Sequence, residues 1–110
     1  MKKDNSYVEY IVYDVLGHID GLTAKKMFSG AGVYLDGSIV ALVIDGELYF
    51  KSNAELMKKY SALGCHPFTY DRNGKMVTMS YMSATEEMLE DRETMSTRIY
   101  ESYDVSNIAK

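Results

Sequence analysis

An apolar stripe recurs at helical spacing near the start of the chain. Its members fall at i, i+3, i+4, i+7, i+8 and i+11, which places them on one side of a helix. They are Val8, Ile11, Val12, Val15, Leu16 and Ile19. Asn5 or Ser6 can cap the amino end, because both side chains accept hydrogen bonds from free helical N–H groups. Gly17 or Gly21 is expected to end this helix.

The pattern then changes to short segments rich in β-branched and aromatic residues, which is typical of strands. Four such segments follow one another, at residues 23–29, 31–35, 39–44 and 47–51. Asp-Gly pairs separate the last three, at 36–37 and 45–46. Type I′ turns need positive φ at both central positions, which Asp-Gly supplies. The sequence therefore predicts three or four antiparallel strands joined by tight hairpins.

A second, short helix is expected after these strands. The residues from Ser52 to Glu55 have the spacing of a capping box, in which two side chains satisfy free N–H groups reciprocally. Leu56, Met57, Tyr60 and Leu63 then follow at helical spacing. Gly64 is expected at the carboxyl end, where a left-handed backbone is common.

A second hairpin and a last helix complete the pattern. After Pro67, residues 68–70 and 75–82 read as strands on either side of a turn at 71–74. Residues 83–86 match the capping box again, and a helical pattern follows. It includes Met88, Leu89, Met95, Ile99 and Tyr103, and it is expected to break near Asp91, itself a candidate N-cap.

The predicted order is α-β-β-β-α-β-β-α. Strands joined by hairpins and followed by helices indicate an antiparallel sheet of about five strands with helices packed on it, the α+β class. A doubly wound nucleotide-binding fold is disfavoured because no βαβ unit is evident. The length of 110 residues suits a single domain, which we assign to residues 1–110.

Composition and charge narrow the function classes. The longest apolar run is six residues, far short of the roughly 20 that a membrane helix needs. The start is basic but has no apolar segment of a signal peptide, and one cysteine cannot form an internal disulfide. A cytoplasmic protein is therefore expected.

The net charge of −4 comes from the carboxyl-terminal part, because residues 83–110 hold seven acids and three bases. Duplex DNA binders usually present a basic face, so unaided DNA binding is not expected. The acidic segment reads either as a solvated helix face or as a docking surface toward a basic partner.

The motifs that carry chemistry are weak. Gly30 and Gly32 begin like a nucleotide fingerprint but lead into a strand, which favours a bulge, a tight bend or a close approach between neighbouring strands. Cys65, His66 and His18 are too few for a structural zinc site. A thiol enzyme would need Cys65 to meet a histidine in space. No catalytic, metal or cofactor residue is assigned.

Tyrosine is the unusual component, with ten residues and no tryptophan. Most tyrosines of a small domain fill core or half-buried sheet positions, but Tyr is also enriched at protein interfaces. Four lie on predicted strands and are our candidate interaction residues: Tyr34, Tyr49, Tyr70 and Tyr81.

Read together, the central residues resemble the N-terminal domain of the TfoX/Sxy family, regulators of natural competence. The first half carries the resemblance at Lys26, Met27, Phe28, Gly30, Gly32, Tyr34 to Gly37 and Leu48 to Lys51; the second half carries it at Gly64, Pro67 to Tyr70, Gly74, Lys75, Met79 to Tyr81 and Leu89 to Asp91. The residues that we single out as its structural motif are Gly30, Gly32, Asp36, Gly37, Pro67 and Phe68.

The resemblance implies an α+β domain with no known catalysis or cofactor. It also implies a role in activating competence genes together with the cyclic-AMP receptor protein. Our leading hypothesis is a stand-alone, non-enzymatic interaction domain that regulates transcription through a protein partner.

Two alternatives stay open. The first is a small-molecule-binding or thiol-dependent enzyme domain that uses Cys65, His66 and nearby tyrosines. The second is a homodimer, which is suggested by the apolar strand at 39–44 and by the need to cover sheet edges.

Overall fold

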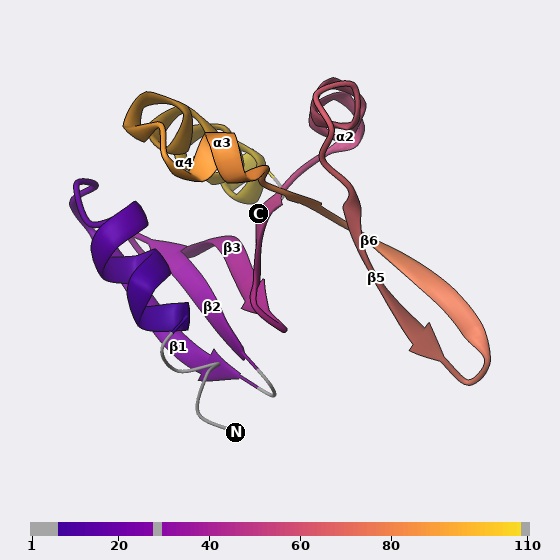
Figure 1. Ribbon diagram of the computed structural model, residues 1–110. Helices are drawn as coiled ribbons and strands as arrows, with labels where there is room; N and C mark the ends of the chain where they lie inside the picture. Colours follow the sequence, from indigo (N-terminus) through magenta and orange to yellow (C-terminus); the bar gives the residue numbers. More distant parts are fainter. Residues whose placement is uncertain (1–6, 28–29, 109–110) are drawn as a thin grey trace.

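The computed structural model describes residues 7–27 and 30–108. Figure 1 shows a sheet with helices on one side of it and a long β-hairpin that extends away from them. The elements in chain order are η1 (Tyr10–Val15), β1 (Leu22–Met27), β2 (Gly30–Leu35), β3 (Ser38–Ile44), β4 (Glu47–Lys51), α2 (Ala54–Ser61), β5 (Pro67–Arg72), β6 (Lys75–Ser83), α3 (Glu86–Leu89) and α4 (Arg92–Ile108). The fold belongs to the α+β class, as predicted.

In the described part of the chain the sheet has six antiparallel strands, in the order β1-β2-β3-β4-β6-β5. The expected number was about five, because the sequence left the count in the first half open. The three two-residue turns at Asp36-Gly37, Asp45-Gly46 and Asn73-Gly74 all have positive φ at both positions. These values fit the type I′ turns predicted for the two Asp-Gly pairs.

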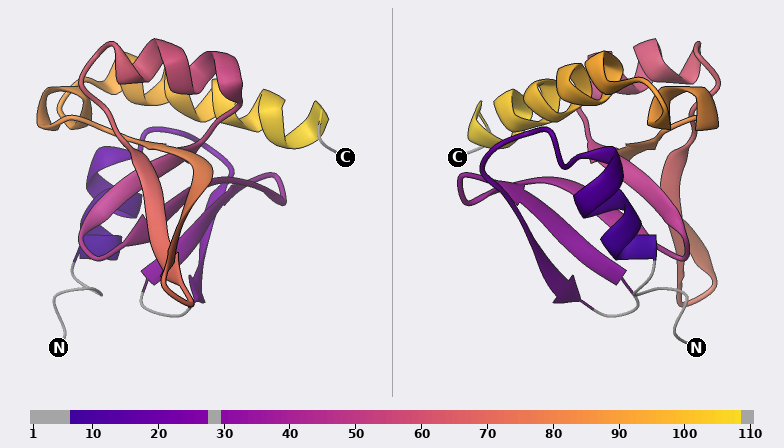
Figure 2. Two further views of the ribbon diagram at one scale, coloured as in Figure 1. Left: turned by 90° about the vertical axis from the view of Figure 1, so that its right-hand side faces the viewer. Right: turned by 60° about the vertical axis from the view of Figure 1, so that its left-hand side comes forward.

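Helices cover one face of the sheet and form the main core with it. Figure 2 shows α4 along one side of the sheet and η1 against β1 and β2. Ile11 and Leu16 from the η1 region and Met95 and Ile99 from α4 are fully buried. They pack against strand residues of this covered face: Val33, Leu35, Val43, Leu48 and Phe50. Each such side chain contributes about 1.5–3 kcal/mol on burial.

A smaller cluster joins α2 to the same side of the sheet. Tyr60 of α2 and Cys65 pack with Met82 of β6. The Tyr60 hydroxyl donates to Glu101 of α4 at 2.6 Å, and Lys59 forms an ion pair with the same carboxylate at 2.8 Å. The two helices are therefore tied to each other as well as to the sheet.

The first helix ends earlier than the sequence spacing predicted, and its turns are wider than those of an α-helix. The π-helical segment η1 ends at Val15, and the Leu16 N–H donates to the Ile11 carbonyl, five residues back, at 2.8 Å. Ile19 is buried but lies in the following turn. The candidate caps Asn5 and Ser6 lie outside the described residues.

Two capping boxes were placed too early. Asn53, not Ser52, caps α2 by accepting from the Leu56 N–H at 2.9 Å. Thr85, not Ser83, caps α3 by accepting from the Met88 N–H at 3.2 Å. Ser52 and Ser83 are buried instead, because both bond to neighbouring sheet backbone. The prediction of Asp91 as a cap is confirmed, since it accepts from the Glu93 N–H at 3.2 Å.

The described helices include none with the length and apolar character needed to cross a bilayer.

Candidate functional site

The second face of the sheet carries a cluster of its own. Leu42, Tyr49 and Tyr81 are buried there, and Met27, Ile39, Ile44 and Phe68 pack against them. Every member of this cluster lies on a strand, so within the described residues no helix contributes to it. We call this side the open face, in contrast to the covered face that packs on η1 and α4.

All four candidate tyrosines lie on the open face. Leu42 and Tyr49 are direct cross-strand partners, and Tyr81 pairs with Lys51, two residues further along β4. The Tyr49 ring contacts Phe68 at 5.2 Å between centroids, and Phe68 stacks on Tyr70 at 6.1 Å. Aromatic rings of β4 and β5 therefore contact each other across the intervening β6, whose Tyr81 belongs to the same cluster.

Tyr34 reaches the same surface from β2. Its ring lies over Gly32, where an added Cβ would stand 3.2 Å from a ring carbon. Tyr34 also affects Tyr81, whose pKa is raised mainly by burial and further by the Tyr34 hydroxyl. The Met27 sulfur also lies against Gly32, and Met27 packs in the cluster that contains Tyr81, so Tyr34 adjoins that cluster.

A β-bulge in the β2–β3 pair changes which side of the sheet successive residues of β3 face. The β2–β3 register shifts between Val33 and Tyr34. As a result two consecutive residues, Val40 and Ala41, belong to the core of the covered face, while Ile39 and Leu42 belong to the open face. This irregularity brings an extra apolar residue to the helices without removing Tyr34 from the opposite surface.

The open face is basic although the chain is acidic. The Nζ of Lys25 lies 5.7 Å from the Tyr34 ring centroid, and the Nζ of Lys51 lies 5.4 Å from that of Tyr81. By strand alternation Arg72 lies on the same side as Tyr70, and it pairs with Lys75. Glu47 is the one carboxylate placed on this face by the described strands, since it alternates with Tyr49.

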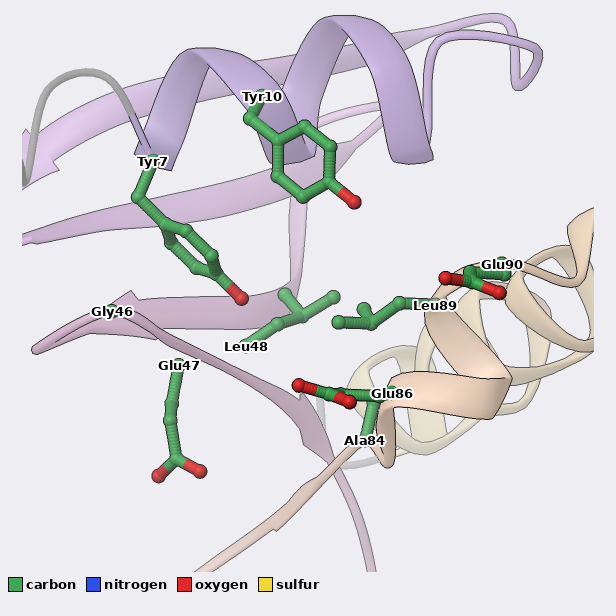
Figure 3. A pocket seen from close by; sticks show the side chains of 9 residues that line it. All are labelled: Tyr7, Tyr10, Gly46, Glu47, Leu48, Ala84, Glu86, Leu89 and Glu90. Atoms are coloured by element: carbon green, nitrogen blue, oxygen red, sulfur yellow. The ribbon is translucent and has the colours of Figure 1, made fainter.

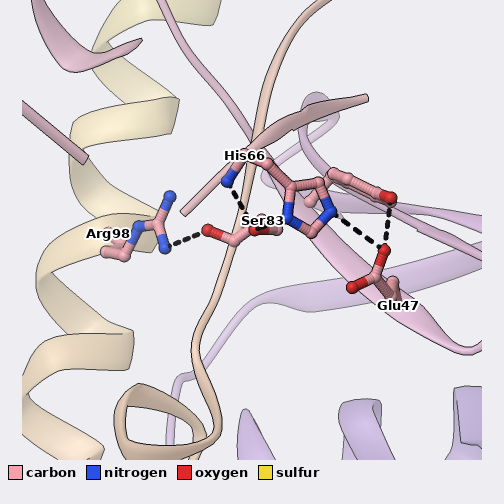
Figure 4. Close-up of polar contacts among 5 residues, drawn as sticks. Glu47, His66, Ser83 and Arg98 are labelled. Carbon is pink, nitrogen blue, oxygen red and sulfur yellow. Dashed lines mark hydrogen bonds and ion pairs between the residues drawn. The ribbon is translucent and has the colours of Figure 1, made fainter. Parts of the chain in front are cut away.

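Glu47 is already engaged at the edge of the open face, as Figure 4 shows. It accepts from the Tyr49 hydroxyl at 2.5 Å, and the His66 ring Nε2 lies 3.2 Å from the same oxygen. Burial and the bond to Glu47 raise the pKa of Tyr49 above its ordinary value. The tyrosine is therefore a neutral donor at physiological pH.

The second ring nitrogen of His66 meets Ser83. Nδ1 lies 3.3 Å from the Ser83 Oγ, which also accepts from the His66 main-chain N–H at 2.9 Å. A serine, a histidine and a carboxylate thus lie in sequence, the order used in nucleophilic hydrolysis. Ser83 is only 3% exposed, however, so its hydroxyl is not presented to a substrate. We interpret the group as a structural link between β4, β5 and β6.

Cys65 does not join this group. Its Sγ lies 3.8 Å from the Met88 sulfur and 3.7 Å from a guanidinium nitrogen of Arg98, on the covered side. Both ring nitrogens of His66 face other residues, and His18 bonds to Ser96 and to the Arg92 carbonyl. The thiol–imidazole contact required by the enzyme alternative is not formed within the described residues. Nor do they contain a cluster of three or more metal-ligating side chains.

Sequence reasoning missed Arg98, a buried cation at the back of the sheet. Arg98 is 1% exposed and donates to the carbonyls of Ser83 at 2.7 Å and Met82 at 3.2 Å. Its guanidinium carbon lies 3.8 Å and 4.4 Å from the ring centroids of Tyr60 and Phe50. Burial lowers the pKa of this guanidinium. The helical periodicity of the sequence could have indicated this burial. Arg98 lies three residues after the apolar Met95 and four before Ser102, which places all three on one side of the helix.

The structural-motif residues hold the sheet in shape. Gly30 allows a close approach of β2 and β3, since an added Cβ would stand 1.7 Å from the Val43 carbonyl oxygen. Asp36 and Gly37 form a turn, and Pro67 begins the edge strand β5 beside Phe68. None of them lies in a pocket that the structure shows.

A pocket lies elsewhere, between the amino end of η1, the β3–β4 turn and α3. Figure 3 shows Tyr7 and Tyr10 on one side of it, Leu48, Leu89 and Glu86 opposite them, and the Glu47 carboxylate turned away below its strand. Its volume is about 440 Å³, and the acidic residues of its lining are Glu47, Glu86 and Glu90. Burial raises the pKa of Tyr7. Among the described residues its lining includes no basic side chain, so this pocket suits a cationic group rather than an anion.

Comparison with known proteins gives two findings. Residues 14–106 match the family model of the TfoX N-terminal domain. A curated relative, the DNA transformation protein TfoX1 of Aliivibrio fischeri (strain ATCC 700601 / ES114), is 26% identical over 81 residues. That alignment covers 74% of this chain and 39% of the relative. The chain therefore spans about two fifths of the length of the curated relative that it matches.

Proposed function

Because this chain belongs to the TfoX N-terminal domain family, we propose that it is a non-enzymatic interaction domain in competence-type transcriptional regulation. It acts through a protein partner, of which a transcription factor such as the cyclic-AMP receptor protein is the leading example. The relative named as a DNA transformation protein supports the competence context.

The observation that carries this proposal is the open face. A sheet face rich in tyrosine, with no helix of the described residues in its cluster, has the composition of an interface core. Tyrosine supplies large apolar area together with a hydroxyl that can pair with a partner. The two Lys–Tyr pairs at Lys25 and Lys51 add charge that can select among partners.

Two features disfavour the other functions. The thiol-enzyme alternative lacks a contact between Cys65 and a histidine, and it would need Cys65, which is 6% exposed, to open. Independent duplex binding is disfavoured by the net charge of −4.

Affinity capture tests the proposal directly. The tagged chain is crosslinked mildly in its native cells and purified from lysates with and without nuclease, and the recovered proteins are compared by mass spectrometry. A transcription factor or RNA polymerase subunit recovered in both samples is the expected result. Recovery of only the chain itself or of metabolic proteins contradicts the regulatory role.

A binding assay with duplex DNA tests the adaptor mechanism separately. The purified chain should show no salt-sensitive DNA binding of its own. Tight binding at moderate salt would overturn the view that a partner supplies the DNA contact.

A further inference from the structure

We infer that the open face binds an extended, acidic segment of a partner protein, centred between the Lys25–Tyr34 and Lys51–Tyr81 pairs. This inference rests on the proposed function, because it names the chemistry of the partner at the same surface.

Charge complementarity is the first argument. The open face carries four cations on its strands, Lys25, Lys51, Arg72 and Lys75, against the single carboxylate of Glu47. Glu47 already accepts from the Tyr49 hydroxyl and lies 3.2 Å from a His66 ring nitrogen, so one of its carboxylate oxygens is engaged at the edge of this face. A surface of this sign attracts carboxylates, and it repels the same basic face of a second copy, so charge disfavours a dimer formed through two open faces.

Two of these cations flank the apolar cluster of the open face. Lys25 extends over Tyr34, which lies with Met27 against Gly32, and Lys51 extends over Tyr81. Met27 and Tyr81 both belong to that cluster, so the two pairs lie at its margins. The cluster is therefore flanked by two ammonium groups, each of which can pair with carboxylate oxygens.

The low exposure of the tyrosine rings on the open face argues against binding of nucleic acid bases by stacking. Base stacking needs accessible aromatic faces. Here Tyr49 and Tyr81 are each only 7% exposed, Phe68 and His66 lie against the Tyr49 ring, and the two lysines lie over Tyr34 and Tyr81. Tyr70, at 37% exposed, is the most accessible of the four candidate tyrosines. The surface thus favours side-chain carboxylates over bases.

A designed peptide provides the probe. It alternates glutamate with threonine over about ten residues, so that an extended backbone turns every carboxylate to one side and spans roughly 33 Å. The molecule measures 38 × 35 × 30 Å, so the peptide matches its width. The control peptide replaces each glutamate by glutamine, which removes charge and keeps length. Binding to the purified chain is measured by fluorescence anisotropy at two salt concentrations.

Lys25 and Lys26 provide a matched pair of variants. Both are exposed neighbours on the edge strand β1, but Lys25 pairs with Gly32 on the open face and Lys26 pairs with buried Ala31 on the other side. Lys25→Glu and Lys51→Glu should each weaken binding of the glutamate peptide by about fivefold or more at low salt. Lys26→Glu should change it less than about twofold. Unchanged thermal midpoints would show that all three variants fold.

Several outcomes overturn the inference. Equal binding of the glutamate and glutamine peptides, or an equal effect of Lys25→Glu and Lys26→Glu, would remove the specific carboxylate site. Tighter binding of a single-stranded oligothymidine, lost in Lys25→Glu and Lys51→Glu, would assign the surface to nucleic acid. A dimer dissociated by the same two variants would assign it to a second copy.

The capture experiment separates this inference from the proposed function. If a transcription regulator is recovered equally by the unaltered chain and by Lys25→Glu/Lys51→Glu, the function stands and the site fails. If the peptide distinguishes Lys25→Glu from Lys26→Glu but no regulator is recovered, the site stands and the regulatory role fails.

Discussion

The two faces of the sheet are built from the same strands but become buried in different ways. On the covered face, η1 and α4 exclude water from Val33, Val43 and Phe50. On the open face, Leu42 and Tyr49 pack against side chains of neighbouring strands, and the His66 ring adds to the cover of Tyr49. The comparison teaches that apolar composition alone does not identify the stabilising face, because the open face also has an apolar cluster and yet is flanked by lysines.

The largest effect should come from equal truncations on the two faces. Phe50→Ala removes a ring that is 1% exposed beneath the helices, and it should lower the free energy of unfolding by about 3–5 kcal/mol. Phe68→Ala removes a half-buried ring from the open face and should cost about 1 kcal/mol. Urea unfolding measures both. Equal losses would show that the open face contributes to the core as strongly as the covered one.

The next effect concerns the cation behind the sheet. Arg98→Ala leaves the carbonyls of Ser83 and Met82 without their donor and opens a cavity between two rings, so it should cost about 3 kcal/mol. Arg98→Lys keeps the charge but cannot reach both carbonyls in the same planar fork, and it should lose less. If urea unfolding shows Arg98→Ala to be nearly neutral, Arg98 does not hold β6 in place.

A smaller effect should appear at alkaline pH. The pKa values of Tyr49 and Tyr81 are raised in the folded state, so folding favours their protonated forms. Their contribution to stability is complete below the ordinary pKa of about 10 and is lost as the pH rises above it, by at most about 1.4 kcal/mol per pH unit for each residue. Tyr49→Phe should therefore flatten the decline of the unfolding free energy between about pH 9 and 11. An unchanged slope would contradict the burial of this hydroxyl on the open face.

The smallest effect should come from the lysine over Tyr81. Lys51→Met keeps the aliphatic chain but removes the ammonium group, and it should change the free energy of unfolding by no more than about 1 kcal/mol. If thermal unfolding showed a much larger loss of stability in Lys51→Met, this cation would stabilise the fold. That result would weaken its assignment to partner binding.

Local signals predicted much of the fold. Asp-Gly pairs identify the hairpins because few other dipeptides adopt positive φ twice in succession. The capping boxes were displaced by one or two residues, since Ser52 and Ser83 match the same spacing but bond within the sheet. The apolar stripe that extends to Ile19 could not show that the helix ends at Val15. Leu16 and Ile19 are buried in the turn that follows, as they would be on a longer helix.

The site was predictable only in part. The sequence placed Tyr34, Tyr49, Tyr70 and Tyr81 on strands, but their meeting on one surface depends on the β4–β6 register and on bulges in two strand pairs. Such registers are set by long-range packing. The role of Arg98 was not predicted either, because a single arginine on a helix is usually solvated.

The pairing of β4 with β6 has a consequence for how the chain folds. The other strand pairs of the described sheet are hairpins between neighbours in sequence, whereas Tyr49 to Lys51 must find Tyr81 to Ser83 across α2 and β5. Hairpins close quickly and distant contacts slowly. Met95, Arg98 and Ile99 are synthesised later still, so a nascent chain exposes the apolar side of its β1–β4 meander until α4 has left the ribosome.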